Sequence, residues 1–245
     1  MLLKTARSKN TLTCRIERAD CIDFLKSLDD ESVDLITTDP AYSGMNQHLN
    51  FGNGRIVGDY QKDRTGKWFD EFHDDPESYR EFLRECHRVL RDNRHIYIMF
   101  DSYSLLTLGP IVREYFNVKN IIIWDKVNLG MGHYFRRRHE HIMFASKGKR
   151  KLNRRDLPDV WRIKRVHKAE YPTQKPVELF EMMLAGSAEP GFVVCDPFVG
   201  SGSSAVATLK VGCSFIGCDI SKKAVRIARD RCRALTPLPE YRERE

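Results

Sequence analysis

Seven short runs of apolar residues are spaced along the chain, and each has the length of one β-strand. Several are rich in Ile and Val and show no strict alternation with polar residues, which is typical of strands that are covered on both faces. The expected strands are Cys14–Ala19, Val33–Thr38, His95–Phe100, Asn120–Trp124, His139–Ala145, Phe192–Cys195 and Ser214–Cys218.

Helical patterns separate these runs. Glu77–Arg91 places its apolar residues on one stripe, Pro176–Ala185 opens with a proline in the first turn, and Ser221–Ala234 begins with a serine cap. Strands that alternate with helices predict an α/β fold with a doubly wound, mostly parallel sheet of seven strands. We see no repeat and no linker, so residues 1–245 are expected to form a single domain.

Two long stretches lack either pattern. They are Ser43–His73, which contains five glycines, and Ala145–Tyr171. Loops of this length in a compact domain are usually functional or mobile, so residues 43–73 are expected to form a mobile loop. The tail from Thr236 is expected to be frayed.

Composition excludes several classes of protein. No apolar run approaches the roughly 18 residues of a membrane span, and the N-terminal residues lack the apolar core of a signal peptide. The seven cysteines are scattered without a C-x-x-C pair, which predicts buried thiols in a reducing compartment and no metal site. We therefore expect a cytoplasmic protein that does not contact a membrane.

Positive charge is concentrated in one segment. The chain has 41 Lys and Arg against 34 Asp and Glu, for a net charge of +7. Within Lys147–Lys168 ten basic residues face only two acidic ones, and Arg136, Arg137 and Arg138 precede them. Such a segment could bind a polyanion, because its cations release counterions from phosphates and its aromatic residues Trp161 and Tyr171 can stack on bases. The alternative is a solvated surface loop.

A glycine-rich turn follows the sixth expected strand. The residues from Asp196 to Ser204 read DPFVGSGSS, and the next strand ends at Asp219. Gly200 and Gly202 allow positive φ and close approach of a ligand, although a tight turn alone would also explain them. Because Ala205 breaks G-x-G-x-x-G and no P-loop lysine follows, the pattern favours a nucleoside without phosphates. Asp219 would accept hydrogen bonds from ribose hydroxyls, and S-adenosylmethionine, a sulfonium cation, suits the nearby Asp196 carboxylate.

A second acidic strand end lies near the front of the chain. The apolar strand Val33–Thr38 is followed by Asp39, Pro40, Ala41 and Tyr42, at the sheet edge where α/β folds bind ligands.

These motifs together resemble those of amino-group DNA methyltransferases. Asp39 to Tyr42 resembles the D-P-P-Y motif, DPFVGSGSS resembles the cofactor motif, and YPTQKPVEL from Tyr171 resembles H-P-T-Q-K-P-x-E-L. With the target-amine motif first and the cofactor motif last, the order is that of the permuted β class. Weaker matches are Arg88-Val89-Leu90, Trp124-Asp125-Lys126 and His139-Glu140-His141. The resemblance covers about residues 14–232. This sequence departs from the family pattern at two positions: it has Ala41 where the family has the second proline of D-P-P-Y, and Tyr171 where the family has the histidine before P-T-Q-K-P.

The resemblance implies a Rossmann-like methyltransferase fold, S-adenosylmethionine as cofactor and double-stranded DNA as partner. It also implies a prokaryotic or phage-infected cell as the source. The expected catalytic residues are Asp39 and the carbonyl of Pro40, which would accept the N–H groups of the target amine, and Tyr42, which would stack on the base. The expected cofactor residues are Asp20, Cys21, Asp39, Thr173, Gln174, Lys175, Asp196, Phe198, Gly200, Gly202, Ser203, Ser204 and Asp219. Simpler interpretations are a helix N-cap for Asp20 and a surface charge for Lys175. We expect Asp101 to be a cap or an ion-pair partner.

In this context we interpret residues 146–170 as a basic target-recognition insertion. The expected DNA-binding residues are Arg136, Arg137, Arg138, Lys149, Arg150, Lys151, Arg154, Arg155, Arg162, Lys164 and Arg165. A base inside a duplex cannot reach such a pocket, so the nucleotide must be flipped out. The resemblance also raises a homodimer, because members of this class often pair. We see no nuclease motif, so a cognate restriction enzyme would be a separate chain.

An acidic first residue in the motif is typical of adenine-N6 enzymes, whereas serine is more usual in cytosine-N4 enzymes. We therefore expect site-specific transfer to the N6 amine of adenine, with cytosine-N4 as the alternative. A non-catalytic DNA-binding relative and an RNA substrate stay open as further hypotheses.

Overall fold

The computed structural model describes residues 12–42, 75–130, 134–167, 169–171 and 173–235. The expected mobile loop of residues 43–73 and the tail from residue 236 lie outside the described residues. The strands are β1 Cys14–Arg18, β2 Val33–Thr38, β3 Leu90–Phe100, β4 Asn117–Asp125, β5 His139–Lys147, β6 Val160–Arg162, β7 Val193–Asp196 and β8 Ser214–Asp219. The helices are α1 Cys21–Lys26, α3 Pro76–Val89, α4 Ser102–Thr107, α5 Gly109–Tyr115, α6 Val177–Ser187, α7 Ser203–Lys210 and α8 Lys222–Arg233.

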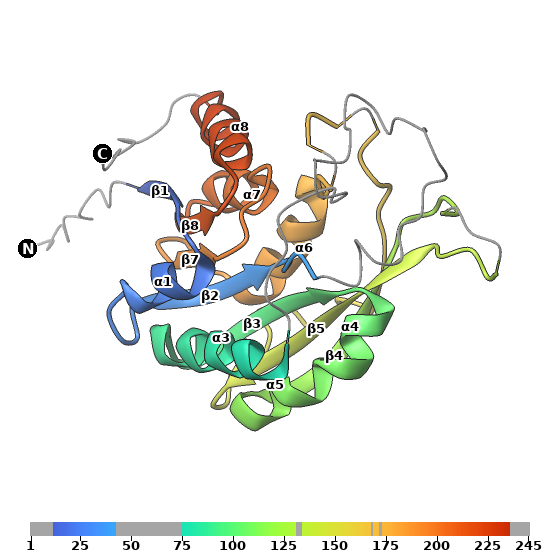
Figure 1. The fold of residues 1–245 in the computed structure, drawn as a ribbon, viewed down its shortest axis with the longest axis horizontal. Helices are drawn as coiled ribbons and strands as arrows, with labels where there is room; N and C mark the ends of the chain where they lie inside the picture. The colour runs from blue at the N-terminus through green and yellow to red at the C-terminus, as the bar shows by residue number, and fades with distance from the viewer. Residues whose placement is uncertain (1–11, 43–74, 131–133, 168, 172, 236–245) are drawn as a thin grey trace, which may run out of the picture.

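The described strands form one sheet in the order β1-β8-β7-β2-β3-β5-β4-β6 (Figure 1). Every neighbouring pair is parallel except the two pairs that β5 makes with β3 and β4. The mostly parallel sheet is thus confirmed, but the expected number of seven strands is wrong. The strand that was not expected from the sequence is β6, which has three residues, of which the middle one is buried. So short a run between charged residues leaves no apolar pattern to recognise.

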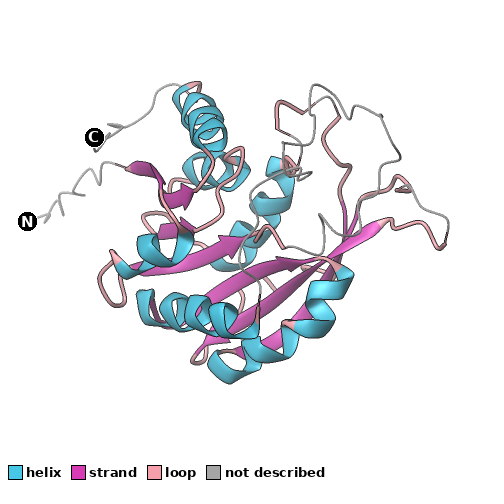
Figure 2. Cartoon of the chain, in the orientation of Figure 1, coloured by secondary structure: helices cyan, strands magenta, loops and turns pink. Residues whose placement is uncertain are grey.

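Helices cover both faces of the sheet (Figures 1 and 2). On one face, residues of α6, α7 and α8 pack with the sheet into one hydrophobic cluster. On the other face, residues of α1, α3 and α5 form a second cluster. The two clusters establish the doubly wound arrangement, because each face of the sheet is buried beneath its own helices.

The helix ends follow local sequence signals. Asp20, Asp75, Asp101 and Ser221 are N-caps whose side chains accept backbone N–H groups at the starts of α1, α3, α4 and α8. The expected cap roles of Asp20, Asp101 and Ser221 are therefore confirmed. Each cap satisfies amide groups that the first helical turn cannot pair internally.

The direction of the crossovers changes between β2 and β7. The chain leaves β2 through α3 for β3 on one side, and leaves β7 through α7 for β8 on the other. Such a switch point opens a crevice at the carboxyl ends of the strands, which is where open α/β sheets bind ligands. At the opposite edge the buried Asp34 carboxylate joins the two halves, because it pairs with Arg91 and Arg94 and accepts the Val193 amide.

Candidate active site

A pocket of about 970 Å³, measured out to its open mouth, lies at the carboxyl ends of β1, β2, β7 and β8. The pocket brings the acidic tip after β2 together with the glycine turn after β7, which are more than 150 residues apart in the chain. Expected residues that line it are Asp20, Cys21, Asp39, Pro40, Thr173, Lys175, Asp196, Phe198, Gly200, Ser203 and Asp219.

Several lining residues were not anticipated as site residues. They come from positions directly after the strands or beside the motifs, and they are Ala19, Ala41, Tyr171, Phe180, Pro197, Val199, Ser201, Ile220 and Ser221. The signal in the sequence was the neighbouring acidic strand end for most of them, and the motif YPTQKPVEL for Tyr171 and Phe180. Such residues shape the walls of a pocket through backbone and apolar surface.

Tyr42 does not lie where the sequence interpretation put it. Its ring is 2% exposed and stacks on Phe100, with the ring centres 5.3 Å apart. Its hydroxyl lies 3.5 Å from the Tyr79 hydroxyl, and burial raises its pKa. The Tyr42 amide donates to the Pro40 carbonyl at 3.0 Å, so the chain bends sharply and directs the ring into the core. In this arrangement Tyr42 supports the tip from behind, and the expected base-stacking face is covered.

Asp39 and Pro40, by contrast, both line the pocket. The Pro40 carbonyl has a second lone pair beyond the one that Tyr42 uses. Asp39 forms an ion pair with Lys175 through its Oδ2 atom. Burial raises the pKa of Asp39, and the Lys175 ammonium only partly offsets this effect.

The turn after β7 is held by two acidic side chains. Asp196 accepts the Phe198 amide at 2.9 Å and the Ser204 hydroxyl at 2.5 Å. Burial raises the pKa of Asp196 to about 7. Asp219, at the end of β8, accepts the Gly200 amide through Oδ2 and the Ser221 amide through Oδ1, each at 2.8 Å. These bonds fix the orientation of the Asp219 carboxylate in the pocket wall.

Three expected cofactor residues are not among the lining residues. Gly202 has φ +82, and a Cβ there would lie 2.8 Å from Ala228, so this glycine allows α7 to pack on α8. Ser204 is buried and donates to Asp196. The backbone N–H of Gln174 donates to the Tyr171 carbonyl, while the buried side-chain Oε1 atom of Gln174 has no partner among the described residues. Gly202 and Ser204 thus shape the turn from within.

The segment from Thr173 to Lys175 lies against the glycine turn. Ser203 donates its hydroxyl to the Lys175 carbonyl at 2.6 Å, which joins the two motifs directly. The Lys175 side chain lines the pocket and is only 10% exposed, so the surface-charge interpretation is wrong.

The ammonium of Lys175 lies between two carboxylates. Besides Asp39 it faces Glu140, whose Oε2 atom is 3.8 Å away. Lys126 in turn donates to Glu140 Oε1 at 3.0 Å. Burial alone would lower the pKa of Lys175, but the two carboxylates outweigh it and raise that pKa. Glu140 and Lys126 belong to the weaker motif matches, to which the sequence analysis assigned no role.

Asp20 and Cys21 form the wall next to β1. Asp20 accepts the amides of Ile22 and Asp23 through Oδ1, so it is at once the α1 cap and a pocket residue. Burial raises the pKa of the Cys21 thiol well above its usual value, which leaves it protonated and unreactive.

The basic residues divide between two ends of the sheet. We call these the pocket edge, at the carboxyl ends of the parallel strands, and the far edge, at their amino ends. Arg136, Arg137 and Arg138 precede β5 at the pocket edge, because His139 pairs with Asp125 at the end of β4. Arg162 ends β6, which runs parallel to β4, so Lys164 and Arg165 follow at this same edge. Beside them Tyr134 and Phe135 are 94% and 104% exposed.

The other five expected DNA-binding residues lie at the far edge. Strand β5 runs against β3, which carries Lys147 to Arg94 at the amino ends of the parallel strands. There Arg150 pairs with Glu189, Arg154 pairs with Asp156, and the Asn153 amide donates to the Gly186 carbonyl at the end of α6. Lys149, Lys151 and Arg155 lie among them. Residues 146–170 therefore do not lie together beside the pocket, which corrects their expected place as one insertion, and their part in DNA binding stays a prediction.

Trp161 is a second correction. It is 4% exposed and donates its indole N–H to the Pro158 carbonyl at 2.8 Å. Because its ring belongs to the core under α6, it cannot stack on a nucleic-acid base.

The pocket suits S-adenosylmethionine. Asp219 is held in the wall where ribose hydroxyls would need an acceptor, and Phe198 and Val199 offer apolar surface for a base ring. Lys175 provides a cation for a carboxylate, and Asp20, Asp39 and Asp196 provide negative charge for an ammonium or sulfonium.

Within the described residues no helix is long and apolar enough to cross a bilayer, and no group of side chains could hold a metal ion.

Comparisons with known proteins agree with this geometry. Residues 33–230 match the family model described as DNA methylase. The chain is 30% identical to the type II methyltransferase M2.DpnII of Streptococcus pneumoniae, over 96% of this chain and 94% of the relative. It is 29% identical to the type II methyltransferase M2.MboI of Moraxella bovis, over 91% and 89%.

A solved structure shows the same fold. It is that of an M1.HpyAVI complex with S-adenosylmethionine, which has a TM-score of 0.65 and 22% identity and covers 89% of this chain and 98% of the other. At 22% identity this likeness shows the fold. The chain belongs to the DNA methylase family.

Proposed function

We propose that this protein transfers a methyl group from S-adenosylmethionine to the N6 amine of adenine at a specific site in duplex DNA. The observation that carries the proposal is the single pocket shared by Asp39, Pro40 and the glycine turn. The likeness to type II methyltransferases supports a role in restriction-modification, with any cognate nuclease on another chain.

The residues of the tip suit activation of an exocyclic amine. Its nitrogen lone pair is delocalised into the base and is a poor nucleophile. Asp39 would accept one N–H and the Pro40 carbonyl the other, which localises the lone pair on nitrogen and orients it. When bound, S-adenosylmethionine supplies the electrophilic methyl group. Asp39 or solvent takes the amine proton as the N–C bond forms and the bond between the methyl group and sulfur breaks, which would leave a neutral thioether. No covalent enzyme intermediate is needed.

The acidic residue Asp39 supports adenine over cytosine as the target, because serine is the more usual residue at this place in cytosine-N4 enzymes. The two amines present the same pair of N–H donors, so product analysis decides between them.

The pocket edge supports contact with DNA. Arg136, Arg162, Lys164 and Arg165 gather there with the exposed rings of Tyr134 and Phe135. Arginines bind phosphates, and aromatic rings can fill the stack that a flipped base leaves. The bacterial sources of the relatives support the cytoplasm of a bacterial cell as the location, and nothing supports a phage-infected cell. A homodimer stays a prediction.

The decisive experiment is transfer of a labelled methyl group to mixed-sequence duplex DNA, followed by digestion and mass analysis of the nucleosides. We expect N6-methyladenine from the wild-type protein. Asp39→Ala should lower transfer by at least about a hundredfold while the Kd for S-adenosylmethionine stays within about tenfold. N4-methylcytosine as the only product would overturn the choice of base. Cofactor binding without any transfer would favour the non-catalytic DNA-binding relative.

A further inference from the structure

The charges around Asp39 form a chain of alternating sign. Lys126 contacts Glu140, Glu140 faces Lys175, and Lys175 contacts Asp39. The members come from four separate parts of the sequence: the tip after β2, the end of β4, the start of β5 and the segment before α6. The carboxylate side chains are 26% and 27% exposed and Lys175 only 10%, so water screens these contacts weakly.

Lys175 has more capacity than one carboxylate uses. An ammonium offers three donors, and Asp39 engages one of them through Oδ2. Glu140 takes a second share of the same ammonium at 3.8 Å. If Glu140 carried no charge, the whole attraction of Lys175 would fall on Asp39. An acceptor that is fully committed to an ammonium is a poorer acceptor for an amine N–H.

The other charged groups near Asp39 are also acidic. Asp101, at the start of α4, and Glu140 both raise the pKa of Asp39, which burial already raises. Asp196, at the end of β7, is close enough that Asp39 in turn raises its pKa. Around Glu140 itself stand Lys175, Lys126 and His141, which hold the pKa of that carboxyl below its usual value despite burial. Glu140 is thus the ionised partner that competes with Asp39 for Lys175.

We propose that Glu140 is a positioning residue for methyl transfer: by sharing the Lys175 ammonium with Asp39, it leaves Asp39 free to accept a hydrogen bond from the target amine. The inference rests on the proposed function for its consequence in catalysis, but the sharing itself is a property of the chain without ligands. Lys126 sets the balance, because it contacts Glu140 through Oε1 while Lys175 faces Oε2 of the same carboxylate.

The test measures the Asp39 titration directly. Protein with ¹³C-labelled aspartate is titrated by NMR without cofactor or DNA, and the Asp39 carboxyl signal is assigned by its loss in Asp39→Asn. Glu140→Gln should lower the pKa of Asp39 by about half to one unit, because the ammonium then serves Asp39 alone. Lys126→Met should raise it, because Glu140 then draws Lys175 towards itself. The exposed Glu178→Gln, which also removes one negative charge, should leave it unchanged.

Single-turnover methyl transfer supplies the second readout. For Glu140→Gln we expect the acid limb of the rate profile to move to lower pH and the plateau to fall about tenfold, with the Kd for the cofactor within about twofold. An Asp39 titration that is unmoved, or that moves the same way in both variants, would overturn the inference, as would loss of cofactor binding in Glu140→Gln. If the titrations shift as expected but wild-type protein transfers no methyl group, the proposed function fails and the sharing stands.

Discussion

Asp196 shows how a single buried acid can serve a pocket at a cost in stability. It is 1% exposed, and its two oxygens accept the Phe198 amide and the Ser204 hydroxyl. Burial nevertheless raises its pKa from 3.8 to about 7. An acid whose pKa is raised on folding destabilises the protein when it ionises. Its penalty is absent below the unfolded pKa, grows as the pH rises, and is complete above the folded pKa.

Asp196→Asn should remove this penalty. The variant should gain stability over wild type, and we expect this gain in the free energy of unfolding to be about 2 to 3 kcal/mol larger at pH 8 than at pH 5. The measurement is urea unfolding at both pH values, with the exposed Asp230→Asn as the matched control. An equal difference between variant and wild type at both pH values would show that Asp196 stays ionised throughout.

The fixed conformation of individual side chains was the part that local sequence predicted least well. Asp39 and Asp219 could be placed because each ends a strand, and strand ends meet at one edge of a parallel sheet. Tyr42 could not be placed, because its ring direction depends on Phe100 and Tyr79, which lie far away in the sequence.

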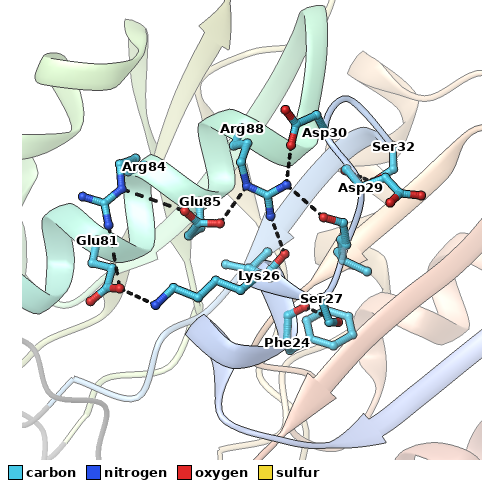
Figure 3. Close-up of polar contacts among 12 residues, drawn as sticks. Phe24, Lys26, Ser27, Asp29, Asp30, Ser32, Glu81, Arg84, Glu85 and Arg88 are labelled. Carbon is cyan, nitrogen blue, oxygen red and sulfur yellow. Dashed lines mark hydrogen bonds and ion pairs between the residues drawn. The ribbon is translucent and has the colours of Figure 1, made fainter.

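At the scale of elements, α1 and α3 are joined by Arg88 and by an ion pair between Lys26 and Glu81 (Figure 3). Arg88 of α3 donates to the carbonyls of Leu25 and Leu28 near the end of α1, and it pairs with Glu85 and Asp30. The carbonyls at a helix end have no partners within the helix, so the guanidinium caps α1 from a neighbouring helix. Its planar fork reaches several acceptors at once, which an ammonium cannot do.

Arg88→Lys should therefore lower the free energy of unfolding by about 1 to 3 kcal/mol, although the charge is kept. Chemical denaturation measures the change. Arg84→Lys, on the same helix, is the control, because Arg84 is 59% exposed and makes only long ion pairs with Glu81 and Glu85. We expect that control to change stability by less than about 0.5 kcal/mol. Equal effects of the two variants would refute the capping role.

At the scale of the whole molecule, the sheet divides the positive charge into two groups. Strand β5 is antiparallel to its neighbours, so the chain leaves it at the edge opposite to the pocket and returns through β6. Half of one continuous basic segment is thereby placed far from the site. Several of its charges are already paired, such as Arg150 with Glu189.

Matched double variants separate the two edges. Lys164→Gln with Arg165→Gln removes two exposed charges at the pocket edge, and Lys151→Gln with Arg155→Gln removes two at the far edge. We expect the first pair to weaken DNA binding about tenfold and to reduce the slope of log Kd against log salt by up to about 2. The second pair should change the Kd by less than about twofold. A larger effect at the far edge would show that DNA contacts both edges.

The sequence by itself determined seven of the eight described strands, the helix caps and the chemistry at the strand ends. These depend on local patterns, because apolar runs, acidic caps and glycine turns act over a few residues. The tertiary structure decided what depends on distant partners: the direction of the Tyr42 ring, the division of the basic segment by an antiparallel strand, and the Lys175 ammonium shared by Asp39 and Glu140. Charged residues that come from three separate elements show no regular spacing in the sequence, because only the folded sheet brings them together.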